Sequence, residues 1–354
     1  MFAVILGFLT AFTLTYLALP VIIRIARDKH LYDVPNERSA HREPTPALGG
    51  IGIFGGTVCA VILWMPGGQF WTIQYVLAAL VIIFFIGVKD DLMPLSPTKK
   101  FIGQVTAALI VVYKSGLKVS SLYGILGVYE LPDLFSFVLT IVIIVGIINA
   151  FNLIDGINGL AGSIGLLASL IWGGWFFLVG HYDLAVLAAC LAGAITAFLK
   201  FNFTPARIFM GDTGSMMIGL ISAVFAIRFI ELQREIPQGG SYSFNAAPAI
   251  ALGILILPVF DTLRVFARRL WQGRSPFTPD RAHIHHLLLD GGLTHMQATA
   301  VLVVINLIFI AVAFLCRHFG NGQLILMELT LALSLSLLAY QWIKYRRSNG
   351  KLSA

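Results

Sequence analysis

The sequence predicts an all-α protein that crosses a membrane about eleven times. Its composition is the first reason, because 58% of the residues are hydrophobic and only 12% are charged, whereas soluble domains carry about 25% charged residues. The second reason is that apolar runs long enough to cross a bilayer as helices follow one another along the chain. Eleven such runs are predicted, at residues 2–23, 49–65, 70–88, 101–117, 134–149, 160–180, 184–199, 215–230, 247–266, 297–316 and 324–343.

The third reason is the placement of the basic residues. Of the 24 Lys and Arg residues, 19 lie in alternate gaps, at the run ends that border them or after the last run, and 5 lie in the other gaps or at the run ends that border those. Because basic residues concentrate in cytoplasmic loops, this distribution predicts an N-terminus outside, a C-terminus in the cytoplasm and an odd number of spans. The first run has no basic segment before it and no evident cleavage site after it, so we expect it to remain as the first span.

The same composition limits the class of protein. Residues 1–354 are expected to form a single integral membrane domain. The net charge of +7 does not indicate nucleic-acid binding, because no basic stripe with interleaved aromatic residues is present. Cys59, Cys190 and Cys316 are isolated in apolar runs, which predicts neither a disulfide framework nor a cysteine metal site.

Two adjacent carboxylates, Asp90 and Asp91, end the third run. Neighbouring residues of a helix point about 100° apart, so these two are not expected to share one proton, and a functional pair would have two different roles. The alternative is that both are solvated charges at a helix end that pair with nearby lysines. The pair by itself favours this alternative.

The stretch from residue 149 to residue 160 ends the fifth run and begins the sixth. Asn149, Asn152 and Asp155 are spaced i, i+3 and i+6, which places them on one helical face if the helix continues. Polar side chains at the end of a span are costly unless they are paired or functional. The spacing predicts that these residues face a ligand, and the alternative is a polar turn between two spans.

Asp212 lies in a glycine-rich turn, FMGDTGS, that opens the eighth run. A helix N-terminus offers free N–H groups to a phosphate, and a carboxylate there would compete with that anion unless it held a cation. Asp212 together with Mg²⁺ and a diphosphate resolves the conflict. The alternative is that Asp212 caps the helix, and the sequence leaves the two readings even.

Three histidines and an arginine, Arg281, His283, His285 and His286, lie within six residues. Neither Cys nor a carboxylate completes a zinc site at a familiar spacing, so we interpret this segment as a donor set for phosphate or sugar oxygens. The alternative is a solvated basic loop. In the first gap, His41 lies among arginines before a Gly-Gly turn and is interpreted as a further anion-binding donor.

Carboxylates, amides, imidazoles and an arginine on one side of a membrane suit a metal-bound diphosphate and suggest one lipid substrate and one water-soluble substrate. In their order along the chain and in their predicted side of the membrane, the four segments resemble those of the polyprenyl-phosphate N-acetylhexosamine-1-phosphate transferases. The resemblance extends from Asp33 to Leu293. The run SPFTPDRAHIHHLLLDGG is especially similar to the WecA type. The phospho-muramoyl-pentapeptide branch has three consecutive histidines and DGxDG, whereas this chain has Ile284 and Asn158 at those points.

The resemblance implies the transfer of N-acetylglucosamine-1-phosphate from UDP-GlcNAc to undecaprenyl phosphate with release of UMP. It also implies Mg²⁺ as the cofactor, with Mn²⁺ as an alternative, and a bacterial cytoplasmic membrane with the site facing the cytoplasm. A homodimer is one expected assembly. The implied roles are activation of the lipid phosphate at Asp90 or Asp91, metal binding at Asp212 and Asn152, a nucleotide pocket at Asp155 and Phe209, and sugar or diphosphate contacts from Arg281, His283, His285 and His286.

Two other interpretations remain open from the sequence. The first is the same reaction with another UDP-linked N-acetyl sugar, because the motifs do not indicate which substituents of the sugar are recognised. A multi-span transporter is the other, although a transporter predicts ionisable residues near the middle of the bilayer, and the carboxylates here gather at the ends of spans.

Overall fold

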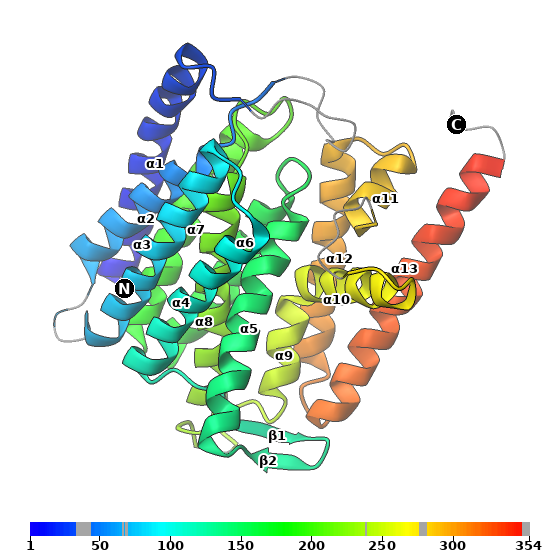
Figure 1. Cartoon of the computed structure of the whole chain (residues 1–354). Coiled ribbons are helices and arrows are strands. Elements are labelled where there is room, and N and C mark those ends of the chain that lie inside the picture. The colour runs from blue at the N-terminus through cyan, green and yellow to red at the C-terminus, as the bar shows by residue number, and fades with distance from the viewer. Residues whose placement is uncertain (33–43, 66, 68–69, 238, 276–281, 349–354) are drawn as a thin grey trace.

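The computed structural model describes residues 1–32, 44–65, 67, 70–237, 239–275 and 282–348. Within them the chain forms thirteen α-helices and one two-stranded antiparallel sheet (Figure 1). The elements are α1 (Phe2–Asp28), α2 (Gly49–Trp64), α3 (Phe70–Leu92), α4 (Pro97–Ser115), β1 (Ser121–Ile125), β2 (Val128–Glu130), α5 (Asp133–Ile154), α6 (Leu160–Leu178), α7 (Tyr182–Asn202), α8 (Gly211–Leu232), α9 (Ala247–Ile254), α10 (Ile256–Trp271), α11 (Ile284–Asp290), α12 (His295–Leu315) and α13 (Asn321–Ser348).

Each predicted apolar run coincides with a helix or, in one case, with two helices. Among the described residues, eight helices are long and apolar enough to cross a membrane, and nine if a bent pair counts as one span. The other two runs correspond to α2, which has only 16 residues, and to α4, which carries three lysines. The chain is therefore a polytopic helical membrane protein, while the count of eleven spans and their orientation stay predictions.

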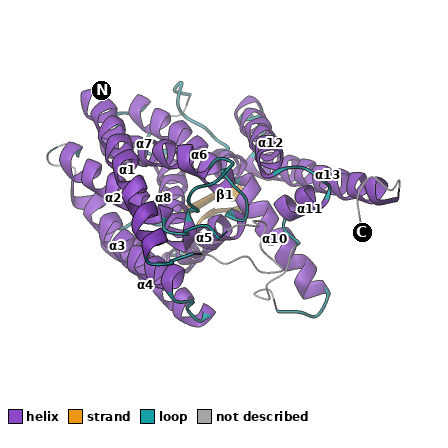
Figure 2. Ribbon diagram, turned by 90° about the horizontal axis from the view of Figure 1, so that it is seen from above, coloured by secondary structure: helices purple, strands orange, loops and turns teal. Residues whose placement is uncertain are grey.

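Helices α7 and α8 form the centre of the bundle. In their most apolar stretches 83% and 89% of the residues are buried, compared with 22% in α1 and 17% in α13. Seen from above, α8 lies among α2, α3, α5 and α6, and α13 extends away to one side (Figure 2). The residue that opens α8 is consequently at the centre of one end of the bundle.

Small residues let two helices approach the first turn of α8. A Cβ atom at Gly50 of α2 would collide with the backbone of Gly214, and one at Gly87 of α3 would collide with the backbone of Thr213. Small residues allow such close crossings in membrane helices. These contacts place the end of α3, which carries the tandem carboxylates, directly beside the start of α8.

The predicted run 247–266 is not one straight helix, because α9 and α10 meet at an angle of 83°. Pro258 has no N–H to donate to the carbonyl of Ile254, one turn earlier. Asn306 of α12 donates to that carbonyl instead, through Nδ2 at 3.2 Å. A buried carbonyl freed by a helix break needs such a partner, and the break turns α10 sideways (Figure 1).

The all-α prediction missed one element, the hairpin of β1 and β2. Its strands pair Ile125 with Val128, and the two residues between them, Leu126 and Gly127, have φ angles of 52° and 78°. Two positive φ angles are typical of the type I′ turns that join hairpin strands. The sequence did not reveal the turn, because leucine stands where asparagine or glycine is usual.

Candidate active site

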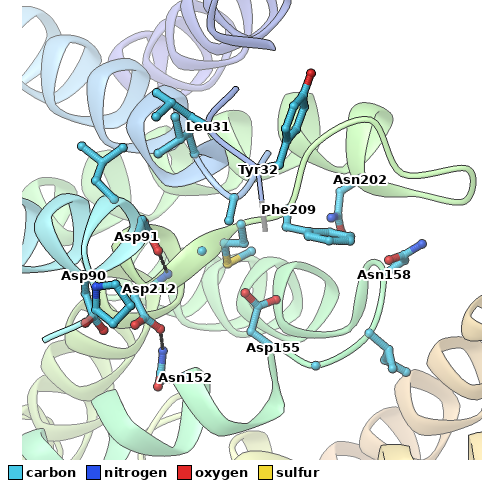
Figure 3. A pocket seen from close by; sticks show the side chains of 18 of the residues that line it. Leu31, Tyr32, Asp90, Asp91, Asn152, Asp155, Asn158, Asn202, Phe209 and Asp212 are labelled. Carbon is cyan, nitrogen blue, oxygen red and sulfur yellow. Dashed lines mark hydrogen bonds between the residues drawn. The ribbon is translucent and has the colours of Figure 1, made fainter. Parts of the chain in front are cut away.

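A polar pocket of about 610 Å³ lies at the end of the bundle where α8 begins. Its wall comes from the ends of α1, α3 and α5 and from the segments that lead into α6, α8 and α12 (Figure 3). Five gaps that are far apart in the sequence therefore meet at one place. Seven of the twelve predicted site residues line this pocket, namely Asp90, Asp91, Asn152, Asp155, Phe209, Asp212 and His286.

Asp91 uses both of its carboxylate oxygens to cap α8. Oδ1 accepts a hydrogen bond from the backbone N–H of Asp212 (2.6 Å), and Oδ2 accepts from the backbone N–H (3.1 Å) and the hydroxyl (2.6 Å) of Thr213. The carboxylate fits there because Gly211 has a φ of 72° and no side chain, and a Cβ atom would lie 2.7 Å from both oxygens. A negative charge at this point also complements the helix dipole.

The cap from Asp91 excludes one of the two readings of Asp212, namely that it caps α8. Since Asp91 already holds the first N–H groups of α8, Asp212 does not cap its own helix, and those N–H groups are not open to a phosphate. The side chain of Asp212 points instead toward α4 and α5. Its carboxylate accepts hydrogen bonds from Asn152 Nδ2 and from Lys100 Nζ, the latter at 2.6 Å.

Lys100 is the centre of a small cluster of oxygen atoms. Its Nζ lies 2.6 Å from Asp212 Oδ2, 3.1 Å from Asp90 Oδ2 and 3.4 Å from Asn152 Oδ1. Asp90 is fixed from its other side, because its Oδ1 accepts from the backbone N–H of Leu95 at 2.5 Å. One ammonium group thus balances two carboxylates that come from different helices.

The donor set around Lys100 fits a divalent cation such as Mg²⁺. Three oxygens from two carboxylates and an amide already surround a positive charge, and oxygen is the ligand that Mg²⁺ prefers. In the part of the chain that the structure describes, no group of three His, Cys, Asp or Glu side chains could hold a metal ion by itself. Mg²⁺ is usually bound by one or two carboxylates together with phosphates of the substrate, so Asp212, Asn152 and Asp90 are the residues that would hold it.

A second cavity, of about 1,010 Å³, adjoins the pocket between α4, α5, α9 and α10. Most of its lining is apolar, but Asp90, Lys100 and Asn152 lie along it. Asp90 and Asn152 line both spaces. The polar pocket and the apolar cavity therefore meet at the oxygen cluster.

Asn149 does not line the polar pocket. Its Nδ2 donates to Gln104 Oε1 (2.7 Å) and to the carbonyl of Val145 (2.8 Å), one turn deeper in the bundle, and it lines the apolar cavity. The three residues predicted to share one face of α5 therefore follow a path from the apolar cavity, through Asn152, to Asp155 in the polar pocket. The helix ends at Ile154, so its face does not extend to Asp155.

The opposite wall of the pocket carries Phe209 and Asp155, which point into the same space (Figure 3). Phe209 is held by its backbone N–H, which donates to the carbonyl of Pro46 at 2.7 Å. Asn202 fixes the loop next to it by donating to Ile208 O (2.9 Å) and accepting from Gly159 N (2.6 Å). An aromatic ring and a carboxyl that face the same space are suited to bind a flat, polar base.

The three histidines of the predicted donor set occupy different positions. His286 lines the pocket, whereas His283 and His285 are buried, with 4% and 1% of their surface exposed. Burial, followed by the proximity of His286, lowers the pKa of His285 to about 3, so its ring is neutral at physiological pH. The remaining two predicted residues, His41 and Arg281, lie outside the described residues.

Comparison with known proteins identifies the family. Residues 73–230 match the family model described as glycosyl transferase family 4. Over 316 residues the chain is 36% identical to decaprenyl-phosphate N-acetylglucosaminephosphotransferase of Mycobacterium tuberculosis, a match that covers 83% of this chain and 78% of that protein. The chain belongs to the polyprenyl-phosphate N-acetylhexosamine-1-phosphate transferase family.

Other members of this transferase family are similar over nearly the same length. The undecaprenyl-phosphate alpha-N-acetylglucosaminyl 1-phosphate transferases of Haemophilus influenzae and Escherichia coli are 32% and 30% identical to the chain. Each match covers 88% of this chain, and 86% and 83% of those proteins. The names of all three relatives give the transfer of an N-acetylglucosamine phosphate, but the mycobacterial name gives decaprenyl phosphate as the carrier and the other two give undecaprenyl phosphate.

The sequence did not reveal Lys100 as part of the transferase site. The sequence predicted only that lysines near Asp90 and Asp91 pair with solvated carboxylates. In the structure the side chain of Lys100 is 16% exposed and lies between Asp90 and Asp212. One signal was available, because Lys99 and Lys100 lie in the first turn of a helix, where the dipole disfavours a positive charge. A lysine kept there needs negative partners, and the structure supplies them from α3 and α8.

Asp155→Asn is expected to change how the stability of this transferase depends on pH. Burial, followed by the charges of Asp212 and Asp91, raises the pKa of Asp155 to about 8. Because the folded state then binds this proton more tightly than the unfolded state, the free energy of unfolding falls as the pH rises. The fall runs from about pH 4, the pKa of the carboxyl in the unfolded chain, to its pKa in the folded protein, and is at most about 1.4 kcal/mol per pH unit. Asp155→Asn should lose this pH dependence and should be more stable than the wild type at pH 8.

Thermal unfolding of the nucleotide-free protein in detergent between pH 5 and pH 9 measures this slope. Asp133→Asn is a suitable control, because that side chain is 85% exposed. Parallel stability profiles for the wild type and Asp155→Asn would contradict the prediction.

Gly156→Ala is expected to displace the segment that carries His283, His285 and His286, which we call the histidine segment. A Cβ atom at Gly156 would collide with Nε2 of His285, a ring with 1% exposure that packs between those of His283 and His286. Such overpacking costs about 1–3 kcal/mol, and His286 beside it would shift relative to the pocket. The expected result is a lower unfolding temperature and a fall of about tenfold or more in substrate turnover, each 1.4 kcal/mol being tenfold. Gly55→Ala in α2, where a Cβ atom meets nothing within 4 Å, should leave both unchanged.

Proposed function

We propose that this protein transfers N-acetylglucosamine-1-phosphate from UDP-GlcNAc to undecaprenyl phosphate and releases UMP. One observation carries the proposal: Asp90 and Asn152 line both the polar pocket and the apolar cavity. A reaction between a water-soluble diphosphate and a lipid phosphate needs such a junction. The two phosphates have to meet, while the nucleotide stays in a polar space and the prenyl chain stays in an apolar one.

The apolar cavity supports a prenyl chain as its occupant. Its volume of about 1,010 Å³ is bounded by side chains such as Phe101, Leu139, Leu252 and Phe266. Each methylene group removed from water contributes about 0.8 kcal/mol, so isoprene units bound there add to the affinity for the lipid. Lys100 at the polar end supplies a positive charge for the phosphate.

The oxygen cluster supports a divalent cation, Mg²⁺ or Mn²⁺, as the cofactor. Asp212 and Asn152 would hold it, and Asp90 faces the same point across Lys100. When bound, the cation would neutralise part of the diphosphate charge and reduce the repulsion between two anionic substrates.

The protein's own residues have to bind, orient and stabilise rather than supply a strong base. The second pKa of a phosphate monoester is about 6, so the lipid phosphate is mostly a dianion at neutral pH. An oxygen of that phosphate attacks the β-phosphorus of UDP-GlcNAc, the bond to the α-phosphate oxygen breaks, and UMP leaves with that electron pair. Asp90, held by Leu95 N and Lys100, orients the attacking phosphate and accepts a residual proton.

Direct attack is favoured over an aspartyl-phosphate intermediate, because the nucleophile is already charged. The reaction exchanges one phosphoanhydride bond for another and is therefore expected to be close to neutral in free energy and reversible. Labelled UMP should exchange into UDP-GlcNAc only when the lipid product is present. Exchange in the absence of any lipid would favour the covalent route.

The site is proposed to face the cytoplasm of a bacterial inner membrane, with the N-terminus outside. Single cysteines in a cysteine-free background test this orientation. A cysteine at Leu126, which is 94% exposed in the hairpin, should react with a membrane-impermeant reagent in intact cells, and one at Met93, 63% exposed beside the pocket, should react only after permeabilisation. The reverse pattern would overturn the proposed orientation.

The decisive test of the function is an assay with purified protein, undecaprenyl phosphate and a panel of UDP-sugars, scored by UMP release with and without Mg²⁺. UMP release that requires the lipid, UDP-GlcNAc and the metal is expected. Preference for another UDP-N-acetyl sugar would change the substrate and keep the reaction. Absence of UMP release with every sugar, together with metal-independent counterflow of a solute in vesicles, would replace the transferase by a transporter.

A further inference from the structure

Asp261 in α10 is a buried carboxylate that has no role in the proposed reaction as described so far. It is 1% exposed and accepts three hydrogen bonds, from Arg264 Nη2 (2.6 Å), from His283 Nδ1 (2.8 Å) and from the backbone N–H of Ile284 (3.0 Å). A buried charge is stable only when it is paired and fully hydrogen-bonded. The chain meets this requirement for Asp261 with donors from two separate elements.

These hydrogen bonds fasten one short segment of chain to α10. Besides pairing with Asp261, Arg264 Nη2 donates to the carbonyl of Ala282 at 2.6 Å. Together with the bonds from His283 and Ile284, this fixes three consecutive residues at the start of α11. Since α11 has only seven residues, its position depends on such anchors more than on its own helical hydrogen bonds.

The anchored segment leads to the wall of the pocket. The ring of His283 is stacked on the ring of His285, with centroids 5.7 Å apart and planes at 10°. The ring of His285 packs in turn against His286 at 4.3 Å, and His286 lines the pocket. A shift of His283 would therefore be passed through packed rings to a group that faces the substrates.

The pair of Asp261 and His283 also fixes the chemistry of the imidazole. A carboxylate accepts a proton but has none to donate when ionised, so Nδ1 of His283 has to carry the hydrogen between them. Nε2 of a neutral His283 is then an acceptor. The same arrangement orients histidines in hydrolases and beside metals, where its loss typically costs about 10–100-fold in affinity or activity.

From this geometry we infer that Asp261 is a positioning residue for the transfer of the nucleotide sugar, acting through His283. The inference rests on the proposed function. Asp261 is not among the described residues that line the polar pocket, so we assign it no direct contact with the substrate. It fixes the tautomer of His283 and the position of the histidine segment, so that His286 faces the sugar diphosphate.

A double-mutant cycle separates this role from a general contribution to folding. Asp261→Asn keeps the shape of the side chain and removes its charge. It should raise the Kd of UDP-GlcNAc and its KM about tenfold, and change kcat at saturating substrate much less. In a His283→Ala background the same substitution should change Kd less than about twofold, because the effects of two residues that act as one unit do not add.

Glu328→Gln is the matched control. Glu328 is also a fully buried carboxylate, at 0% exposure, but it lies in α13. Among the described residues it is not part of the pocket wall, and its oxygens have no hydrogen-bond partner there. We expect this variant to bind UDP-GlcNAc like the wild type. An equal loss in Asp261→Asn with and without His283, or no loss at all, would overturn the inference.

A second measurement needs no variant of Asp261 and stays informative if Asp261→Asn does not fold. In wild-type protein with ¹⁵N-labelled histidine, the signals that disappear in His283→Gln report on this ring. A protonated, hydrogen-bonded Nδ1 is expected, and an unprotonated Nδ1 would refute the pair. If UDP-GlcNAc neither binds nor reacts, the proposed function fails, while the tautomer still reports on Asp261 and His283 separately.

Discussion

Replacing Asp212 by alanine is expected to abolish metal-dependent UMP release and to leave the protein folded. The carboxylate is the one that Asn152 and Lys100 both contact, and its loss removes a charged ligand from the proposed cation site. Losing a single preorganised electrostatic group costs about 100–1,000-fold in turnover, and the loss of a metal ligand is expected to be at the upper end. UMP release with and without Mg²⁺ measures the effect.

The fold should survive this substitution for a structural reason. Asp91 caps α8 through the backbone N–H of residue 212, which alanine also provides, and Lys100 keeps its pair with Asp90. Size-exclusion behaviour and the unfolding temperature check this point. Asp133→Ala, a change at an 85% exposed side chain, is the control for general effects. Normal turnover by Asp212→Ala would refute the metal role.

Asp90→Asn and Asp91→Asn are expected to differ, although the two residues are adjacent. Asparagine at position 90 keeps an oxygen for the N–H of Leu95, so stability should change little. Because the side chain lies at the junction of both cavities, turnover should fall by about 100-fold or more, well beyond any loss of nucleotide affinity. Equal losses of turnover and nucleotide affinity would count against a role in the chemistry.

Asp91→Asn should first affect the stability of the protein. Its carboxylate accepts from two backbone N–H groups and a hydroxyl at the start of α8, and an amide has only one oxygen for these three donors. Loss of such a cap costs about 0.5–2 kcal/mol, which thermal unfolding detects. Turnover would fall as a consequence, because Asp212 is the second residue of the helix that loosens. A variant as stable as Asp90→Asn would contradict the capping role.

Asp91 and Asp261 illustrate what the spacing of residues did not reveal. The motif of Asp91 predicted a catalytic carboxylate, and the only partner that sequence spacing offers Asp261 is Arg264, three residues later, with which it does pair. In the structure each also accepts backbone N–H groups at the start of a helix from elsewhere in the chain. Sequence spacing gives the direction of a side chain on its own helix, but it contains no information about which foreign helix begins beside it.

The sequence by itself determined that this chain is a polytopic helical protein of this transferase family with its polar motifs in alternate gaps. Those properties follow from apolar length, charge distribution and local motifs, which are written along the chain. Only the tertiary structure decided that Asp91 caps α8, that Lys100 joins Asp90 to Asp212, and that His283 is buried against α10. Such roles depend on how closely helices cross, and that is set by glycine contacts and a broken helix that bring together residues more than a hundred positions apart.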